Sequence, residues 1–424
     1  MFKKWVYKIE PVKVFYLLLF FEFINISYYF YYLSSHSYLP APFLYDSNDT
    51  LMDFYTPLFW VIKDGFYTTF NSVYPALNYY FLKIFAVAVP ANQVSNAFQL
   101  RDQFPVLGLI VSFLYVLIIW VAVNIGEWRK IHFIHRGLIF LACLLSVPVL
   151  FGLERGNLIF LALLFLALYL NASNPWFKAI FLGLLINVKP YFVILLLPYL
   201  NFHQFNKVEL IRTILITAVI FFGLGLLVEL NLSDFFKAYL GFAKKGAISI
   251  EGVVALPHSI AALSAIKALV DFGTGSAYTF WFSLLKGLNY ASVVLLLCTA
   301  LFKKLTPLEL FIASMIMLTN FSMSTGGYIL IIYIVLIPYL LQSIEYKKLL
   351  IFILLIFALP LDWINFLELK NFPKYSYIGG NIFIGEPSHF LAIGSIFRPL
   401  FNFSLMIIFL MHLYKKYPRI INAA

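Results

Sequence analysis

The sequence is short of charged residues. Only 12% of its 424 side chains are Asp, Glu, Lys or Arg, whereas 62% are hydrophobic. Soluble globular domains carry roughly twice that charged fraction, so the shortage excludes an ordinary soluble domain. The net charge of +11 does not indicate nucleic-acid binding, because the basic residues stand mostly between hydrophobic segments, where they orient a membrane protein.

Cysteine is nearly absent. Cys143 and Cys298 are the only two, and both lie within apolar runs, which excludes a disulfide framework and a cysteine-ligated metal cluster. The motifs of soluble chemistry are missing as well: there is no phosphate-cradling glycine loop, no nucleophile elbow and no zinc-ligand spacing. Function therefore has to be sought in residues embedded among apolar segments.

What the sequence has in abundance is long hydrophobic runs, several of about 18 or more residues, enough for a helix to cross a bilayer. We expect an all-α polytopic membrane protein with about twelve transmembrane helices, at residues 14–33, 104–125, 137–152, 157–171, 176–187, 190–200, 211–229, 277–302, 306–321, 327–344, 348–361 and 392–413. The segments at 176–187 and 190–200 are short for a full crossing, so they are either half-helices or one helix broken at Asn187-Val188-Lys189-Pro190.

Basic residues predict the orientation. Lysines precede the first span, and short basic connections recur on the side that this assigns to the cytoplasm, which puts both termini inside. Residues 1–424 then form a single transmembrane domain with three long external segments, at 34–103, 230–276 and 362–391. In the first of these, the aromatic stretches 54–70 and 74–90 are predicted to be helices lying along the membrane surface.

An acidic cluster follows the first span. Asp46, Asp49 and Asp53 lie close together just before an aromatic stretch, and Asp49 and Asp53 would share one face of a helix. A solvated acidic loop is the plain interpretation. The functional one is that a carboxylate held at the membrane surface acts as a general base toward a hydroxyl group.

Four blocks of sequence carry a family resemblance. They are Asp53-Phe54-Tyr55 with Lys63-Asp64-Gly65-Phe66-Tyr67 and Val73-Tyr74-Pro75-Ala76-Leu77; Leu153-Glu154-Arg155-Gly156-Asn157 followed by Lys189-Pro190; Leu256-Pro257-His258-Ser259; and Asn320 to Tyr328. In this order they resemble the GT-C superfamily of membrane glycosyltransferases, most closely glycosyltransferase family 87, the polyprenol-phosphate-mannose-dependent mannosyltransferases. The chain departs from the family in having one proline after Tyr74 and no histidine in the last block, whose role would fall to His258 or His389.

The resemblance implies a GT-C-like fold and inverting transfer of a sugar from a polyprenyl monophosphate to a hydroxyl group, with no metal and no other cofactor. It implies Asp53 as the catalytic base, with Asp49 as the second choice or a helper. Arg155, Lys189 and His258 are the candidates for binding the donor phosphate, since isolated cations in apolar sequence are costly and usually functional. The substrate-binding candidates are Tyr55, Glu154, Asn157 and Tyr328.

Plainer roles stay open for the two cations. Arg155 could form an ion pair with Glu154 or another acid, and Lys189 could extend its ammonium group to the membrane surface. We expect the donor to carry a mannose-like hexose or a pentose, the acceptor to be a glycolipid or polysaccharide, and the site to face outward from a bacterial cytoplasmic membrane. Two alternatives remain: an envelope polysaccharide polymerase or ligase that uses a lipid diphosphate donor, and a lipid or sugar transporter.

Overall fold

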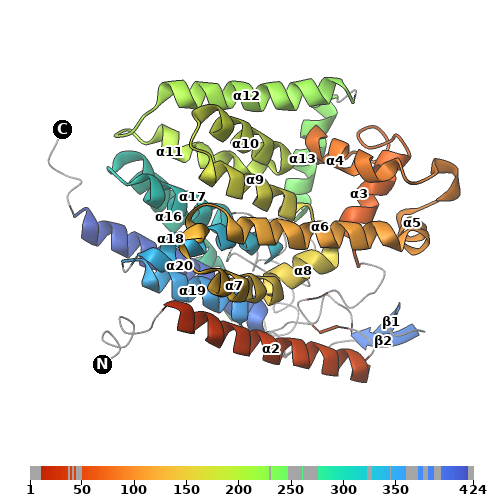
Figure 1. Ribbon diagram of the computed structural model, residues 1–424, viewed down its shortest axis with the longest axis horizontal. Helices are drawn as coiled ribbons and strands as arrows, with labels where there is room; N and C mark the ends of the chain where they lie inside the picture. The colour runs from red at the N-terminus through yellow and green to blue at the C-terminus, as the bar shows by residue number, and fades with distance from the viewer. Residues whose placement is uncertain are drawn as a thin grey trace.

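The computed structural model of the protein describes residues 11–36, 39–40, 43, 50–228, 231–246, 260, 276–321, 327–343, 345–359, 371–375, 381–385 and 393–418. Within these residues the chain is almost wholly helical (Figure 1). The exception is one antiparallel pair of short strands, β1 (Asn371–Tyr375) and β2 (Asn381–Gly385). The predicted helical architecture is therefore confirmed for the described residues outside this pair, which lies in the segment 362–391.

Five helices of the described chain are long and apolar enough to cross a membrane. They are α2 (Pro11–His36), α6 (Pro105–Asn124), α12 (Lys207–Leu226), α16 (Ser276–Phe302) and α20 (Ile393–Lys416). A sixth crossing results if α7 (Phe133–Leu145) and α8 (Val147–Arg155), bent by 60° at their junction, form one span. The chain is thus a multi-pass membrane protein.

The expected number of about twelve spans is not confirmed. Every predicted segment contains helix, but several helices are too short: α9 (Ile159–Asn171), α10 (Pro175–Val188), η4 (Pro190–Leu196) with α11 (Leu197–Leu200), α17 (Pro307–Phe321), η5 (Gly327–Leu336) with α18 (Ile337–Gln342), and α19 (Lys347–Ala358). The 14 residues of α10 rise about 21 Å, which is less than the roughly 30 Å of a bilayer core. Hydropathy locates these helices but does not say whether each one crosses.

The described part of the segment predicted to be external, 34–103, folds into α3 (Met52–Ile62), α4 (Ala76–Ala86), the 3₁₀ turn η2 (Ala91–Gln93) and α5 (Ala97–Gln103) after the end of α2. These helices are shorter than the predicted 54–70 and 74–90. The side chain of Asp64 is 82% exposed, in keeping with a surface position. Phe54 and Leu58, in contrast, are completely buried. Their burial means that α3 packs onto the body of the protein instead of only lying along the membrane.

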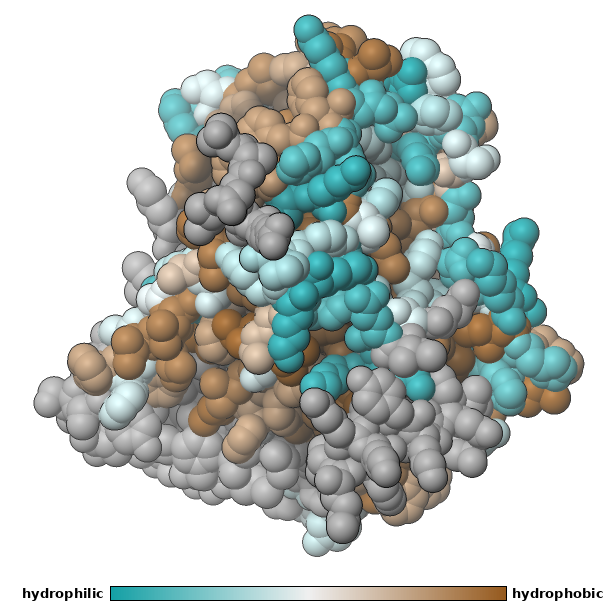
Figure 2. All heavy atoms as spheres, turned by 90° about the vertical axis from the view of Figure 1, so that its left-hand side faces the viewer, coloured by the Kyte–Doolittle hydropathy of each residue, from teal (hydrophilic) through white to brown (hydrophobic). Residues whose placement is uncertain are grey.

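The two ends of the molecule in Figure 1 carry different segments. The N-terminal end of α2 and the C-terminal end of α20 both lie at the left of Figure 1, whereas α3, α4 and α5 lie at the right. The side chain of Asn201, after α11, donates to the carbonyl oxygen of Lys303, after α16, at 2.8 Å. This hydrogen bond joins two of the basic connections. Figure 2 looks onto the left end and shows hydrophilic side chains gathered in a band, with hydrophobic ones around them.

Glu309 ties three helices together at this end. Its side chain is completely buried, and its Oε2 accepts from the backbone N–H of Thr306 at 2.7 Å and from the hydroxyl of Tyr417 at 3.0 Å. Its Oε1 accepts from the hydroxyl of Tyr346 and pairs with the ammonium group of Lys416, both at 3.0 Å. Thr306 and Glu309 form a capping box at the start of α17, so one carboxylate both starts that helix and holds α19 and α20 against it.

Replacing Glu309 by Gln should therefore lower the stability of the protein in detergent by about 1–3 kcal/mol, because the buried hydroxyl of Tyr346, the half-buried hydroxyl of Tyr417 and the ammonium of Lys416 lose a charged acceptor. The matched control is Glu127→Gln. Glu127 pairs with Lys130 at 2.7 Å in a partly exposed position, and that change should cost at most about 1 kcal/mol. Thermal unfolding of the two variants measures the difference, and equal melting temperatures would contradict the role given to Glu309.

Candidate functional site

The candidate site begins where α3 meets the end of α8. Leu51, the residue before α3, has φ +61°, a left-handed conformation that is strained for a residue with a Cβ. Its backbone N–H donates to the carbonyl oxygen of Glu154 at 2.7 Å. This contact joins the two elements and sets the direction in which α3 leaves the junction, with Asp53 in its first turn.

The local sequence Glu154-Arg155-Gly156-Asn157 determines where α8 ends. The N–H of Gly156 donates to the carbonyl of Leu153, and the N–H of Asn157 donates to that of Gly152, both at 3.0 Å. This is the Schellman ending of a helix, and it requires a left-handed residue at Gly156, whose φ is +67°. A Cβ on Gly156 would stand 3.0 Å from Cβ of Phe54, so glycine also permits the close approach of α3.

Asp53 meets two of the predicted site residues at this junction. Its Oδ1 pairs with the guanidinium of Arg155 at 2.9 Å, and its Oδ2 accepts from the amide nitrogen of Asn157 at 2.7 Å. The side chains are 21% exposed for Asp53 and 15% for Arg155. Asn157 in turn accepts from the backbone N–H of Ile159 at 2.9 Å, which fixes its amide at the start of α9. The carboxylate is therefore held by two donors from one connection.

Lys189 lies close to this group. It occupies the connection between α10 and η4, outside the membrane-crossing helices, and its ammonium nitrogen stands 4.8 Å from the ring centroid of Tyr74. Burial lowers the pKa of Lys189 to about 8, and the negative charge of Asp53 opposes that change. Burial, followed by the charge of Asp53, raises the pKa of Tyr74 well above its usual value. Tyr74 therefore stays a neutral ring beneath the cation.

The break in α10 that presents Lys189 is stabilised by a side chain from α4. Pro190 has no N–H, and the N–H of Phe192 donates to the carbonyl of Lys189 at 3.1 Å instead of continuing the α-helical pattern. The last carbonyl of α10, that of Val188, is satisfied by the completely buried amide nitrogen of Asn78 at 3.0 Å, which also reaches Asn187 O at 3.4 Å. Asn78 thus replaces backbone donors that the broken helix lacks.

Two further predicted residues lie beside the group. The Oε1 of Glu154 accepts from the hydroxyl of Thr50 at 3.2 Å, which makes Glu154 part of the junction between α3 and α8. The ring of Tyr328 stacks on Phe151 with 5.9 Å between centroids, and Tyr328 lies near enough to Tyr74 to affect its pKa. Tyr328 therefore joins the site from η5, more than a hundred residues further along the chain.

Other predicted residues are not part of the group. Tyr55 is completely buried, its hydroxyl donating to the carbonyl of Phe104 at 2.8 Å and accepting from the N–H of Gly108 at 2.7 Å. It joins α3 to the start of α6, a structural position that is closed to a substrate, because both hydrogen bonds of the hydroxyl are used. Asp49, His258 and His389 lie outside the described residues.

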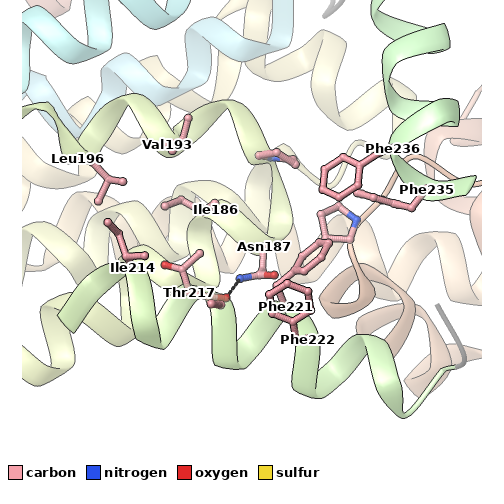
Figure 3. A pocket seen from close by; sticks show the side chains of 13 residues that line it. Ile186, Asn187, Val193, Leu196, Ile214, Thr217, Phe221, Phe222, Phe235 and Phe236 are labelled. Atoms are coloured by element: carbon pink, nitrogen blue, oxygen red, sulfur yellow. Dashed lines mark hydrogen bonds between the residues drawn. The ribbon is translucent and has the colours of Figure 1, made fainter. Parts of the chain in front are cut away.

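An apolar groove adjoins the site, with a cavity volume of about 350 Å³. Pro75 and Pro190, the residues that follow Tyr74 and Lys189, line it, and its far wall consists of α12 and α13 (Leu232–Gly246). Figure 3 shows phenylalanine side chains from these two helices facing the end of α10 across it. A ligand with an apolar chain and an anionic head could place its head at Lys189 while its chain occupies the groove.

Sequence reasoning missed Tyr74 and Asn78 as parts of this site. Tyr74 belongs to the same block of the family resemblance as the predicted base Asp53, and that shared block was a signal that Tyr74 could lie at the site. Asn78 offered none, because an asparagine in a short helix becomes informative only when the carbonyl groups it satisfies are known. No group of three or more His, Cys, Asp or Glu side chains suited to a metal ion occurs within the described part of the chain.

The chain matches no protein-family model, no curated protein and no solved structure. The resemblance to the GT-C superfamily therefore depends on the sequence motifs alone.

Replacing Gly156 by Ala tests whether the junction depends on close approach. A left-handed alanine costs about 1–2 kcal/mol, and its Cβ would press on Phe54. We expect Gly156→Ala to melt at a lower temperature than the wild type and to move Asp53 away from Arg155. Gly137→Ala in α7 is the matched control, because a Cβ there meets nothing within 4 Å and should leave stability equal or slightly higher. Equal behaviour of the two variants would contradict the account.

Proposed function

We propose that the protein is an inverting glycosyltransferase that moves a sugar from a polyprenyl monophosphate to a hydroxyl group of an acceptor at the outer face of a bacterial cytoplasmic membrane. The observation that carries the proposal is the juxtaposition of Asp53, Arg155 and Asn157 with the buried Lys189, beside a groove open to apolar chains. A carboxylate held in place and a cation next to an apolar channel suit a reaction between a hydroxyl group and a lipid-linked phosphate.

In the proposed reaction the acceptor oxygen attacks the anomeric carbon of the sugar from the side opposite the phosphate. The new bond joins that oxygen to the anomeric carbon, and the bond between this carbon and the phosphate oxygen breaks. The acceptor proton passes to Asp53, and the bonding electron pair leaves with the polyprenyl phosphate. Inversion follows because bond making and bond breaking occur on opposite faces of one carbon.

The two cations have different tasks in this scheme. Arg155 holds the Oδ1 of Asp53 at 2.9 Å, which fixes the direction of the carboxylate, while Asn157 fixes its other oxygen. Lys189 lies over Tyr74 and precedes Pro190, which lines the groove; in this scheme it stabilises the charge that builds on the departing phosphate. Asn157 and Arg155 are thus positioning residues, and Asp53 and Lys189 face the reacting atoms.

The experiment is a panel of polyprenyl-phosphate sugars offered to the purified protein in detergent, with Asp53→Asn as the variant. Loss of a general base lowers turnover by roughly 10²–10⁴-fold, and the isosteric amide keeps the fold. Asp64→Asn is the control, since that acid belongs to the same external segment but is largely exposed. The turnover rate is measured as cleavage of the sugar–phosphate bond of a radiolabelled donor.

Turnover by Asp53→Asn at the rate of Asp64→Asn would remove Asp53 as the base. Turnover with lipid diphosphate donors alone would favour an envelope polymerase or ligase. Uptake or export of a sugar lipid into vesicles without any bond cleavage would favour a transporter.

The pKa of Lys189 predicts a pH dependence. The ammonium is charged below about pH 8 and loses its proton as the pH rises through that value, so binding of an anionic donor should weaken there. Tyr74 stays neutral over this range, because burial and then Asp53 hold its pKa well above the usual value. We expect kcat/KM for the donor to fall above pH 8 in the wild type and to stay level in Lys189→Arg, whose guanidinium remains charged. An identical alkaline limb in both proteins would exclude Lys189 as its source.

A further inference from the structure

A second cavity, of about 320 Å³, lies at the other end of the protein from the proposed reaction site. Its walls come from the end of α9, the starts of α10, α12 and α17, and the segment from α11 to α12. Figure 1 shows α11 and the start of α12 at the left, opposite α3 and α4. This cavity and the groove that Pro190 lines share no residue, so the two are separate sites.

The second cavity contains charges of both signs. Lys178, in the first turn of α10, and Glu209, in the first turn of α12, both line it, and both are half-buried. Within the described part of the chain neither side chain forms an ion pair or a hydrogen bond. A purely anionic ligand would be repelled by Glu209, and a purely cationic one by Lys178. The cavity therefore matches a ligand that carries both charges.

Neutral polar groups add further donors and acceptors. The hydroxyls of Tyr169 and Tyr199 lie 3.4 Å apart, and both residues line the cavity. The hydrogen bond between them uses one of their two protons, which leaves the other for a ligand. The amide nitrogen of Gln204 donates to the carbonyl of Leu305, so the oxygen of this lining amide is left as an acceptor. The cavity thus offers an O–H and an ammonium group to an anion, and two kinds of oxygen to a cation.

The rim of the cavity has the composition of a membrane surface. Four residues next to lining ones in the chain are apolar and more than half exposed, namely Trp176, Phe177, Phe205 and Val208. Arg212, on the membrane-crossing helix α12, holds its guanidinium 4.7 Å from the ring of Trp176. Indole rings and the ends of long basic side chains gather at the boundary between lipid tails and head groups. The cavity therefore opens at the depth of the head groups.

We propose that this cavity binds the head group of a zwitterionic phospholipid whose ammonium group carries N–H donors, as in an ethanolamine phospholipid. The phosphate lies at Lys178 and the tyrosine hydroxyls, and the ammonium group lies at Glu209. The acyl chains run beside α12, only 11% of whose apolar window is buried within the protein. The lipid then joins the starts of α10, α12 and α17. This site is additional to the proposed glycosyltransferase site and does not depend on that activity.

The test compares three phospholipids that have identical acyl chains and carry ethanolamine, choline or glycerol on the phosphate. Native mass spectrometry of the full-length protein in detergent measures the affinity for each. The ethanolamine lipid should bind about 10-fold more tightly than either of the others, the ratio that one hydrogen bond between charged groups provides. Choline has no N–H to donate to Glu209, and glycerol leaves the lipid with a negative charge only.

Two variants assign the preference to the cavity. Glu209→Gln should reduce the preference for ethanolamine over choline to about 2-fold or less, and it should improve binding of the glycerol lipid, because the carboxylate charge is gone. Glutamine keeps the backbone N–H that donates to Asn206 at 3.1 Å, so the start of α12 is preserved. Lys178→Gln should weaken all three lipids by about 10-fold, because each one contains the phosphate.

The matched controls are Lys207→Gln and Asp234→Asn. They change the net charge by the same amounts, but neither residue lines the cavity, so the three affinities should equal those of the wild type. Melting temperatures establish that each variant is folded. The comparison of the three lipids on the wild type decides the proposal even if a variant fails to fold.

Equal affinities of the wild type for the three lipids would overturn the proposal, as would an unchanged ethanolamine preference in folded Glu209→Gln. Displacement of the ethanolamine lipid by an equimolar amount of free phosphoethanolamine would overturn it too, because the cavity would then take a soluble zwitterion instead of a lipid. A loss of the preference in Lys207→Gln would place the head group outside the cavity and have the same consequence.

Discussion

The ion pair between Asp53 and Arg155 is the interaction on which the site depends. At 2.9 Å and with little exposure, the two charges compensate each other, and the amide of Asn157 adds a second donor to the carboxylate. The left-handed Leu51, the glycine at position 156 and the amide of Asn157 all serve to bring the two groups together. The same contact attaches the start of α3 to the end of α8, so the fold and the proposed chemistry depend on one pair of side chains.

The broken helix α10 is the second element of this arrangement. Pro190 ends the helix, Asn78 from α4 satisfies the carbonyl groups of Asn187 and Val188, and Lys189 follows directly after them. The same break forms one wall of the apolar groove. A single interruption therefore supplies both a buried cation and one wall of the apolar groove, which explains why the two are close in the chain.

The two ends of the protein differ in their chemistry. At the end where two basic connections meet, Glu309 accepts from hydroxyl groups and pairs with Lys416, and these contacts join α17 to α19 and to the end of α20. At the end with α3 and α4, the acid and the cations lie beside a groove. Polar groups join helices at the first end, whereas at the second they gather around Asp53, next to the connection whose Pro190 lines the groove.

The sequence by itself determined the membrane setting, the positions of the helices, and Asp53, Arg155, Asn157 and Lys189 as residues of interest, because hydropathy, helix endings and isolated charges are local properties. It did not determine how many helices cross, since a short apolar helix has the same composition whether it crosses or stops. Only the tertiary structure decided that Arg155 pairs with Asp53, that Tyr55 is closed off by α6, and that Tyr74 and Asn78 belong to the site. Each of these outcomes depends on which distant segments meet, and long-range packing, not local pattern, sets that.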